Sequence, residues 1–138
     1  MRIKDIQAEV IGVGKLTPAQ RRAAIQLGQQ LVPNTVPEML YLAAVKGKQI
    51  VGVLSADCAC SPAVVHVLAV DPKHQRQGIG MHLIEDFEKR MQFLDISDVE
   101  VDCNTAESQA LFEKAGYAFN GKYGYKHTMA ADLSNDLH

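Results

Sequence analysis

Apolar and polar residues alternate along this chain in two rhythms, one typical of strands and the other typical of helices. Between residues 98 and 103 every second residue is apolar, which indicates a strand with one buried face. Between residues 83 and 94 the apolar residues recur every three or four positions, as they do along one side of a helix. The same patterns predict, in chain order, a strand within residues 2–13, a helix over 18–32, strands over 39–45, 49–56 and 63–70, a helix from residue 78, a strand over 98–103, a helix over 108–115, and a closing hairpin of 117–121 and 123–133.

Residues that begin or end helices and turns support these boundaries. Thr17 can cap the first helix, Pro18 suits its first position, and Gln20 completes a capping box with Thr17. A turn at Gly47 separates the second and third strands, and Gly116 is a natural end for the last helix. This order of elements predicts one α/β (α+β) domain over residues 1–138, in which helices flank a mixed sheet.

Composition narrows the class of protein without indicating a function. The 138 residues carry a net charge of −2 and are 47% hydrophobic and 22% charged, so we expect a globular domain with no nucleic acid as its partner. No apolar stretch reaches the length of a membrane helix and no secretory signal opens the chain, so we expect no membrane partner and a cytoplasmic location. An odd number of cysteines does not make a disulfide framework, and Cys58-Ala59-Cys60 lacks the second ligand pair of a zinc site, so no metal is expected.

The stretch from residue 65 to residue 81 carries the strongest chemical signal. An apolar strand runs into Pro72-Lys73-His74-Gln75-Arg76-Gln77-Gly78-Ile79-Gly80, and a helix follows. Glycines at a helix start let the backbone approach a ligand, and the unpaired N–H groups and the dipole of the helix favour an anion there. The arrangement therefore predicts a phosphate site. It fits neither common nucleotide loop, because no Gly-Lys-Ser/Thr follows and Leu83 stands where a dinucleotide fingerprint has its third glycine.

Two motifs resemble a known family. Pro72-x-x-Gln75-x-x-Gly78-x-Gly80 closely resembles the P-x-x-R/Q-x-x-G-x-G/A motif of the GNAT superfamily of acyl-CoA-dependent N-acetyltransferases. Leu111-Phe112-Glu113-Lys114-Ala115-Gly116-Tyr117 is similar to the L-Y-E-K-x-G-F signature of the same family, and it follows the next strand at the expected separation. The resemblance covers residues 39–133.

The resemblance implies a fold and a cofactor site. In this family the strand before the phosphate turn splays from its neighbour, within a mixed and mostly antiparallel sheet, and the pantetheine arm of acetyl-CoA pairs with backbone in the gap. That arm would lie along Leu68, Ala69 and Val70. The pyrophosphate would lie on the turn. Two further residues, which both come after the next strand, would also contact the cofactor. These expected contacts are Gln75, Arg76, Gln77, Gly78, Ile79 and Gly80 in the turn, and then Asn104 and Phe112.

The resemblance also implies a reaction. The chain would move an acetyl group from acetyl-CoA to a primary amine of a small molecule or of a protein or peptide, by direct transfer through a ternary complex. A homodimer is compatible with this reading. The alternative is a catalytically idle acyl-CoA-binding module that regulates a partner.

The chain departs from the family pattern where protons move. The tyrosine often proposed as general acid matches Phe112, and the carboxylate base of some members matches Val64. Tyr123 and Tyr125 lie in the final hairpin and are the candidate replacements for the phenol, although an edge position with ordinary packing also explains them. His66 is the candidate relay for the amine proton, on the expectation that simple alternation places it on one face with Val64, Leu68 and Val70, although a core histidine is the commoner case. Cys103 is a less favoured acceptor of the acetyl group.

Overall fold

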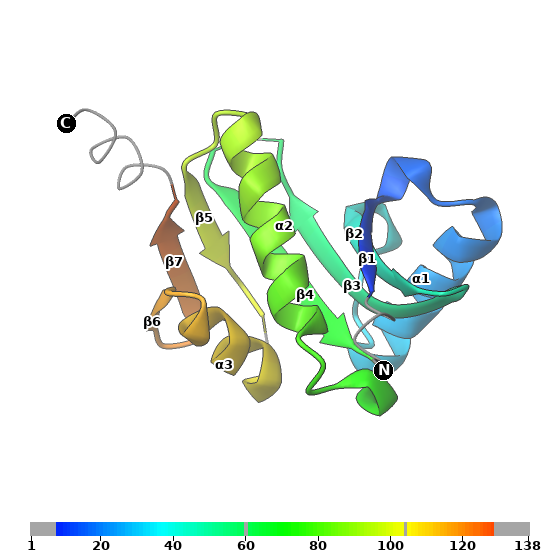
Figure 1. Cartoon of the computed structure of the whole chain (residues 1–138). Coiled ribbons are helices and arrows are strands. Elements are labelled where there is room, and N and C mark those ends of the chain that lie inside the picture. Colours follow the sequence, from blue (N-terminus) through cyan, green and yellow to red (C-terminus); the bar gives the residue numbers. More distant parts are fainter. Residues whose placement is uncertain (1–7, 60, 104, 129–138) are drawn as a thin grey trace, which may run out of the picture.

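The strands and helices of the computed structural model follow the order that the sequence predicts, over the described residues 8–59, 61–103 and 105–128 (Figure 1). The strands are β1 (Glu9–Gly12), β2 (Leu40–Lys46), β3 (Gln49–Asp57), β4 (Ala63–Val70), β5 (Asp98–Val101), β6 (Ala118–Asn120) and β7 (Tyr123–His127). The helices are α1 (Pro18–Leu31), α2 (Ile79–Phe93) and α3 (Ala106–Lys114), with 3₁₀ turns at Val13–Lys15, Pro37–Met39 and Pro72–His74. Cys60, Asn104 and the positions expected in strands before residue 8 or after residue 128 lie outside the described residues.

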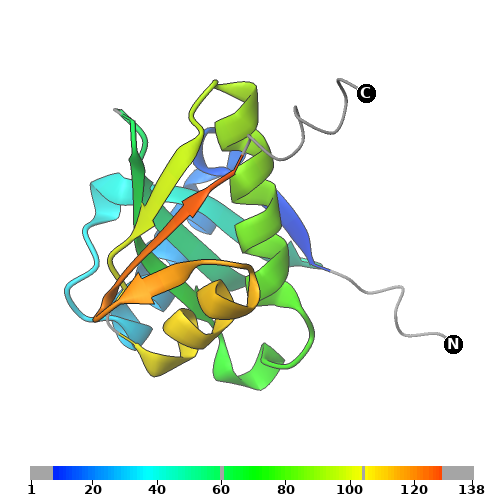
Figure 2. The same ribbon diagram turned by 90° about the vertical axis from the view of Figure 1, so that its left-hand side faces the viewer.

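One seven-stranded sheet, in the order β1-β2-β3-β4-β5-β7-β6, forms the centre of the molecule. β4 and β5 are parallel and the other neighbouring strands are antiparallel, so the expected mixed, mostly antiparallel sheet is confirmed. A parallel pair needs a crossover connection, and α2 supplies it between β4 and β5. Figures 1 and 2 show α2 and α3 on one face of the sheet and α1 on the other.

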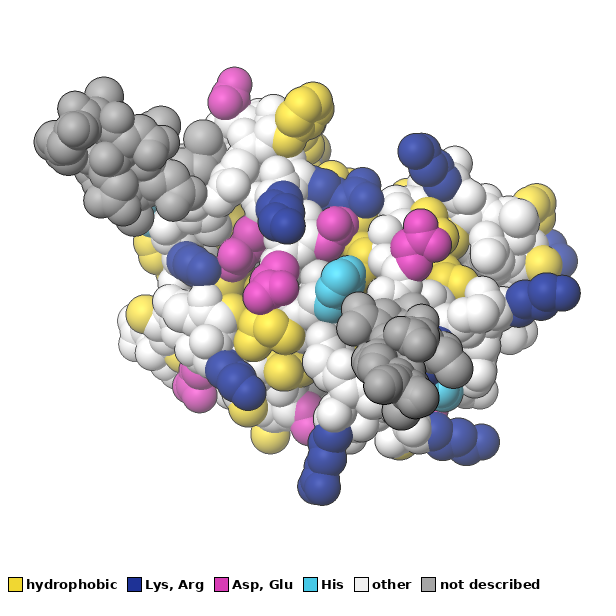
Figure 3. Space-filling model, in the orientation of Figure 1, with side chains coloured by type: hydrophobic (Ala, Val, Ile, Leu, Met, Phe, Trp, Pro, Cys, Tyr) yellow, Lys and Arg dark blue, Asp and Glu magenta, His cyan; other side chains and the backbone are white. Residues whose placement is uncertain are grey.

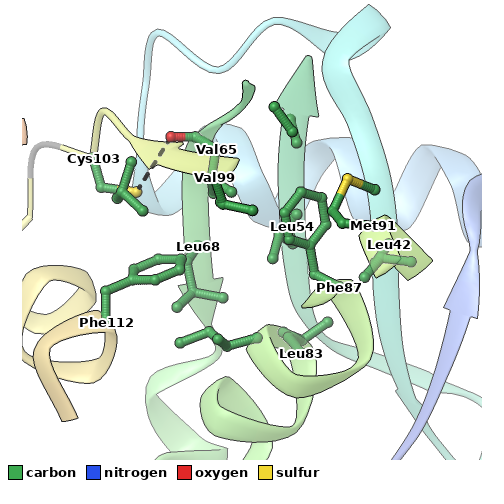
Figure 4. Packing of buried hydrophobic residues seen from close by; sticks show 14 of the residues in the cluster. Leu42, Leu54, Val65, Leu68, Leu83, Phe87, Met91, Val99, Cys103 and Phe112 are labelled. Carbon is green, nitrogen blue, oxygen red and sulfur yellow. Dashed lines mark hydrogen bonds between the residues drawn. The ribbon is translucent and has the colours of Figure 1, made fainter. Parts of the chain in front are cut away.

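Each face of the sheet has its own apolar core. Under α2, Leu83, Phe87 and Met91 pack against buried residues of the sheet, as Figure 4 shows. On the opposite face, Ala24 of α1 belongs to a second cluster of buried residues that includes Val67 of β4. The second half of β4 is therefore covered on both faces, as its apolar sequence predicts.

β4 contains a β-bulge at His66, and the bulge corrects one expectation. Ser55 of β3 pairs with Val67 and the next residue of β3 pairs with Val65, so His66 has no partner of its own on that strand. The extra residue breaks the alternation of the strand. Val65 and Leu68, three residues apart, accordingly pack in the same α2 core. The expectation that His66 shares a face with Leu68 and Val70 is therefore wrong, because simple alternation does not continue through a bulge.

β4 and β5 stay paired over only part of their length. The pairing ends at Val65 and Val101, and the last hydrogen bond runs from the Asp102 N–H to the Val65 carbonyl at 2.7 Å. β4 then continues to Val70 on β3 alone, while the chain after β5 turns into α3, which Thr105 caps through the Ser108 N–H. This divergence explains why β5 ends two residues before the predicted position 103 and why α3 begins before residue 108. The splayed sheet that the resemblance implies is thus present.

The closing hairpin is fastened to the α2 face by one lysine. Lys126 Nζ lies 3.2 Å and 3.3 Å from the two carboxylate oxygens of Glu88 on α2, and it donates to the Ala115 carbonyl at 2.8 Å. The Glu88 side chain is only 15% exposed, so it depends on this partner for most of its electrostatic compensation.

We predict that Lys126→Met lowers the free energy of unfolding by about 2 kcal/mol, because it leaves a mostly buried carboxylate unpaired. Chemical denaturation measures the change. Lys122→Met, in the turn of the same hairpin, removes an exposed lysine and should cost no more than about 0.5 kcal/mol. Equal, small effects of the two substitutions would contradict the role given to Lys126.

Candidate functional site

The turn before α2 has the backbone that an anion site needs. Gly78, the N-cap residue of α2, has a left-handed φ of 80°, and no side chain caps the helix. Arg76, two residues earlier, also has a positive φ, of 68°. The Asp71 side chain accepts a hydrogen bond from the Lys73 N–H and fixes the start of the turn. The first-turn N–H groups of α2 are therefore left for solvent or a ligand, at the positive end of the helix dipole.

A cavity of about 550 Å³ opens beside this turn. Its volume is in the range of pockets that hold small molecules and cofactors. Eight of the residues expected to bind the cofactor line it: Leu68, Ala69, Val70, Gln75, Arg76, Gly78, Ile79 and Gly80. The cavity thus joins the turn to the part of β4 that has no pairing with β5.

Two of the expected cofactor contacts are not among the residues that line this cavity. Gln77 does not line the cavity, and its side-chain oxygen accepts a hydrogen bond from Lys46 Nζ at 2.8 Å. Phe112 is fully buried and packs edge-on against Tyr117, with 4.9 Å between the ring centroids, and Figure 4 shows it within the α2 core. A tyrosine at position 112 would therefore bury its hydroxyl in this core. Asn104 is outside the described residues.

The sequence did not predict that residues of α1 and α3 line this cavity. The last turn of α1 adds Leu31, and α3 adds Ser108, Leu111 and Lys114. The cap at Thr105 is the one sequence signal that could have located the start of α3 beside the gap. Lys114 and Arg76 bring two positive charges to the cavity wall, which suits a phosphate-bearing ligand.

The two candidate tyrosines occupy different places along β7. The Tyr125 hydroxyl donates to Asp98 Oδ1 at 2.6 Å, at the start of β5, and this hydrogen bond raises the pKa of the phenol. Asp98 also contacts His127 Nδ1 at 2.7 Å, and the bonds from Tyr125 and then His127 lower the pKa of that carboxyl. Tyr123 precedes Gly124, the partner of Val101, so it stands where β4 and β5 separate. Tyr123 is therefore nearer the gap, and Tyr125 is held away from it.

Cys103 lies at the gap but is poorly suited to nucleophilic attack. Its sulfur is 4.0 Å from the Val65 carbonyl oxygen, as the dashed line in Figure 4 marks, and its side chain is buried. Burial raises the pKa of the thiol to about 11, so the reactive thiolate is scarce at neutral pH.

The outer surface over α2 carries mixed charges. Figure 3 shows Lys and Arg side chains interspersed with Asp and Glu side chains on this face, without a broad area of one sign. Among the described residues, none of the helices combines the length and the apolar character that crossing a membrane requires.

The splayed sheet, the left-handed turn and the cavity between them define a class of protein. The sequence profile of the Acetyltransferase (GNAT) domain matches residues 12–130. The chain therefore belongs to the GNAT family of acetyltransferases. A search of curated protein sequences returns no match.

Solved structures share this fold at low sequence identity. An aminoglycoside 6'-N-acetyltransferase complexed with coenzyme A is 15% identical, with a TM-score of 0.75 over 88% of this chain and 98% of that one. Ard1 from Thermoplasma volcanium is 13% identical, with a TM-score of 0.73 over 91% and 100% of the two chains. The ribosomal-protein-S18-alanine N-acetyltransferase from Escherichia coli is 16% identical, with a TM-score of 0.68 over 89% and 96%. At these identities the likeness concerns the fold.

The two glycines of the motif have different surroundings. A Cβ on Gly80 would lie 2.6 Å from Leu111 Cδ1 on α3, so Gly80 permits the close packing of α2 on α3. A Cβ on Gly78 would meet nothing within 4 Å, but the φ of 80° disfavours other residues. Substitution at Gly80 is therefore expected to disturb packing, whereas substitution at Gly78 is expected to act on the turn.

We predict that Gly78→Val weakens coenzyme A binding at least tenfold and costs about 1–2 kcal/mol of stability from its left-handed backbone. Calorimetry and chemical denaturation measure the two effects. Gly121→Val is the matched control, because Gly121 has a φ of 74° and open space in the β6–β7 turn. It should lose similar stability and keep its affinity. Equal affinity in the two variants would place the cofactor elsewhere.

Proposed function

We propose that this chain is an N-acetyltransferase that moves an acetyl group from acetyl-CoA directly to a primary amine. One observation supports the proposal above the others: the cavity at the Gly78 turn continues along Leu68, Ala69 and Val70, where β4 has left β5. A pyrophosphate and an extended amide-bearing arm need these two features in this order. The membership of the chain in an acetyltransferase family agrees with it.

The cofactor would be held mainly by backbone. The N–H groups at the start of α2 would bind the pyrophosphate, with Arg76 and Lys114 adding charge-assisted contacts. The two amides of the pantetheine arm would pair with the free edge of β4, as a peptide pairs with the edge of a sheet. Because backbone groups would make most of these contacts, substitutions of the surrounding side chains would change the affinity little. The shape of the turn, which depends on the left-handed backbone of Gly78, would matter more.

The reaction needs a neutral amine and a leaving thiolate. Attack of the amine on the thioester carbonyl builds negative charge on oxygen, and an N–H of β4 would stabilise that charge. The thiol of the cofactor has a pKa near ~8.5 by analogy with cysteine, so its thiolate leaves readily and water can protonate it. An acid at position 112 is therefore not required.

The acceptor would approach the sheet face opposite α2, beside β5 and β7. Glu100 of β5 and Asp102, the first residue after β5, flank the buried Val101, which directs their side chains to this face. Both a small amine and a protein or peptide amine remain compatible with it. The similar structures include an aminoglycoside acetyltransferase and a ribosomal-protein acetyltransferase, so they do not decide between the two acceptor types.

The alternative is an acyl-CoA-binding module without catalysis. It is favoured by Phe112, a buried phenylalanine at the position where the family pattern has a tyrosine, so that position offers no phenol to donate a proton. An amine-dependent release of free coenzyme A separates the alternatives, because a binding module would give none.

We predict that acetyl-CoA stabilises the protein and that NAD does not. A ligand at one hundred times its dissociation constant adds about 2.7 kcal/mol, which raises the melting temperature by several degrees in a domain of this size. Differential scanning fluorimetry with each ligand measures the shift. A shift with NAD or ATP and none with acetyl-CoA would overturn the cofactor assignment.

We predict that Tyr123→Phe and Tyr125→Phe each keep kcat within a few-fold of the parent, because water serves the departing sulfur. Steady-state release of coenzyme A under saturating amine is the measurement. A loss of about 10²-fold or more in Tyr123→Phe, with acetyl-CoA binding unchanged, would instead identify that phenol as the general acid. Tyr125, whose hydroxyl is bound to Asp98, provides the matched comparison on the same strand.

A further inference from the structure

We propose that His66 is the proton acceptor for the attacking amine and that Asp102 positions its ring. This inference rests on the proposed transfer reaction and names the residues that would serve it. His66 Nδ1 lies 3.9 Å from Asp102 Oδ2, and the two side chains are 39% and 37% exposed. That distance is longer than a hydrogen bond, as is common for catalytic pairs before substrate binds, and short enough for an ion pair with a charged imidazole.

The backbone places this pair at the closed end of the gap. Asp102 is the residue whose N–H makes the last bond to Val65, and His66 is the next residue of β4. If the pyrophosphate lies at the Gly78 turn and the arm runs from Val70 towards Leu68, the arm cannot pass the bond at Val65. An arm that fills the gap would then bring the acyl end within about one residue of His66, since successive residues of a strand are ~3.3 Å apart.

The bulge directs the His66 side chain to the side from which an acceptor can come. Without it, alternation would continue unbroken, and His66 and Leu68 would lie on one face. With the bulge, His66 lies outside the α2 core and next to the carboxylate of Asp102, the residue that follows β5. α1 covers β2, β3 and the second half of β4 on this face, so its cluster does not include His66. The imidazole therefore faces solvent while its backbone belongs to the cofactor strand.

The charges around the ring favour a cationic amine there. Besides Asp102, the groups that the strand registers place on the same face are Asp57 of β3, opposite Val64, and Glu100 of β5, also opposite Val64. On β7, Tyr123 lies beside Gly124, which pairs with Val101 of β5, so it is the nearest residue of β7 to Asp102. An ammonium group entering from this side would be attracted before it gives up its proton.

The neutral imidazole of His66 takes one proton from the ammonium of the acceptor, which leaves a nucleophilic amine. The lone pair of that amine forms the C–N bond, and the C–S bond breaks with its electron pair on sulfur. The proton that nitrogen loses on becoming an amide passes through water to the thiolate. The proton on His66 then goes to solvent, so one proton is released in each turnover.

A purely structural role is the competing explanation, in which the pair only ties β4 to β5. The two roles differ in what a substitution changes. A structural tie affects stability and cofactor affinity together, whereas a proton acceptor affects kcat and its pH dependence and leaves acetyl-CoA binding intact. A proton acceptor works only in its unprotonated form, so its loss should also change how kcat depends on pH.

The test measures the pH profile of amine-dependent coenzyme A release, together with the melting shift given by acetyl-CoA, in matched variants. His66→Gln should lower kcat by about 10²–10⁴-fold, abolish the rise of kcat with pH, and keep the melting shift. Asp102→Asn should lower kcat by a smaller factor, and Asp102→Glu should recover part of it. His127→Gln and Asp98→Asn are the controls, because they alter a second His–Asp pair, 2.7 Å apart, at the far end of β5. They should retain both kcat and the parental profile.

Three outcomes separate the possibilities. If His66→Gln retains kcat and its pH profile, as the controls do, the assignment of His66 is overturned while the transferase proposal stands. If His66→Gln and Asp102→Asn lose the acetyl-CoA melting shift, the pair is structural and the assignment is also overturned. If the parent binds acetyl-CoA but releases no coenzyme A with any amine, the proposed function itself fails, and this inference fails with it.

Discussion

The hydrogen bond from Asp102 to the Val65 carbonyl marks the point on which the site depends. Up to this bond β4 and β5 form an ordinary parallel pair, and beyond it the two strands have different partners. β4 stays on β3 as far as Val70, and the chain after β5 is drawn into α3 by the Thr105 cap. The consequence is a strand edge inside the sheet that has no partner strand beyond Val65, an arrangement that soluble domains usually avoid.

Packing on the α2 face keeps this edge open. Phe112 fills the core beneath α3 and contacts Tyr117, and Leu111 lies so close to Gly80 that its side chain would have to move to admit a Cβ there. α3 is thereby held against the start of α2. Free backbone groups along a buried strand cost about 1–3 kcal/mol each when nothing pairs with them. Leu68 and Ala69 are nearly buried, so a ligand that pairs with backbone groups left unpaired on this edge would recover that free energy.

Much of the fold was accessible from the sequence, and the reasons are local. The apolar run Ala63–Val70 has the predicted bounds, and the capping box of Thr17 and Gln20 begins α1 where it was expected. Gly78 has the left-handed backbone that its motif requires. These features depend on a few neighbouring residues, so pattern and propensity suffice to find them.

The features that escaped prediction depend on contacts between distant segments. The bulge at His66 arises from the register between β3 and β4, and alternation along one strand cannot reveal it. The Tyr125 hydroxyl is held by Asp98, 27 residues away, and this contact separates it from Tyr123, which the sequence treats as equivalent. The tight contact at Gly80 likewise comes from Leu111 on another helix. The turn and the strand that line the cavity were therefore predicted from the sequence, whereas the surroundings of His66 and Tyr125 were not.

Amide hydrogen exchange along β4, with and without acetyl-CoA, tests the central claim most directly. The account predicts that acetyl-CoA slows exchange of those N–H groups between His66 and Val70 that do not bond to β3, and leaves the amides of Ala63 to Val65 unchanged because they lie in a paired segment. It also predicts slower exchange at the first turn of α2, around Ile79 and Gly80. Protection confined to other strands, with the free edge of β4 unaffected by a saturating cofactor, would contradict the claim that this gap holds the acyl arm.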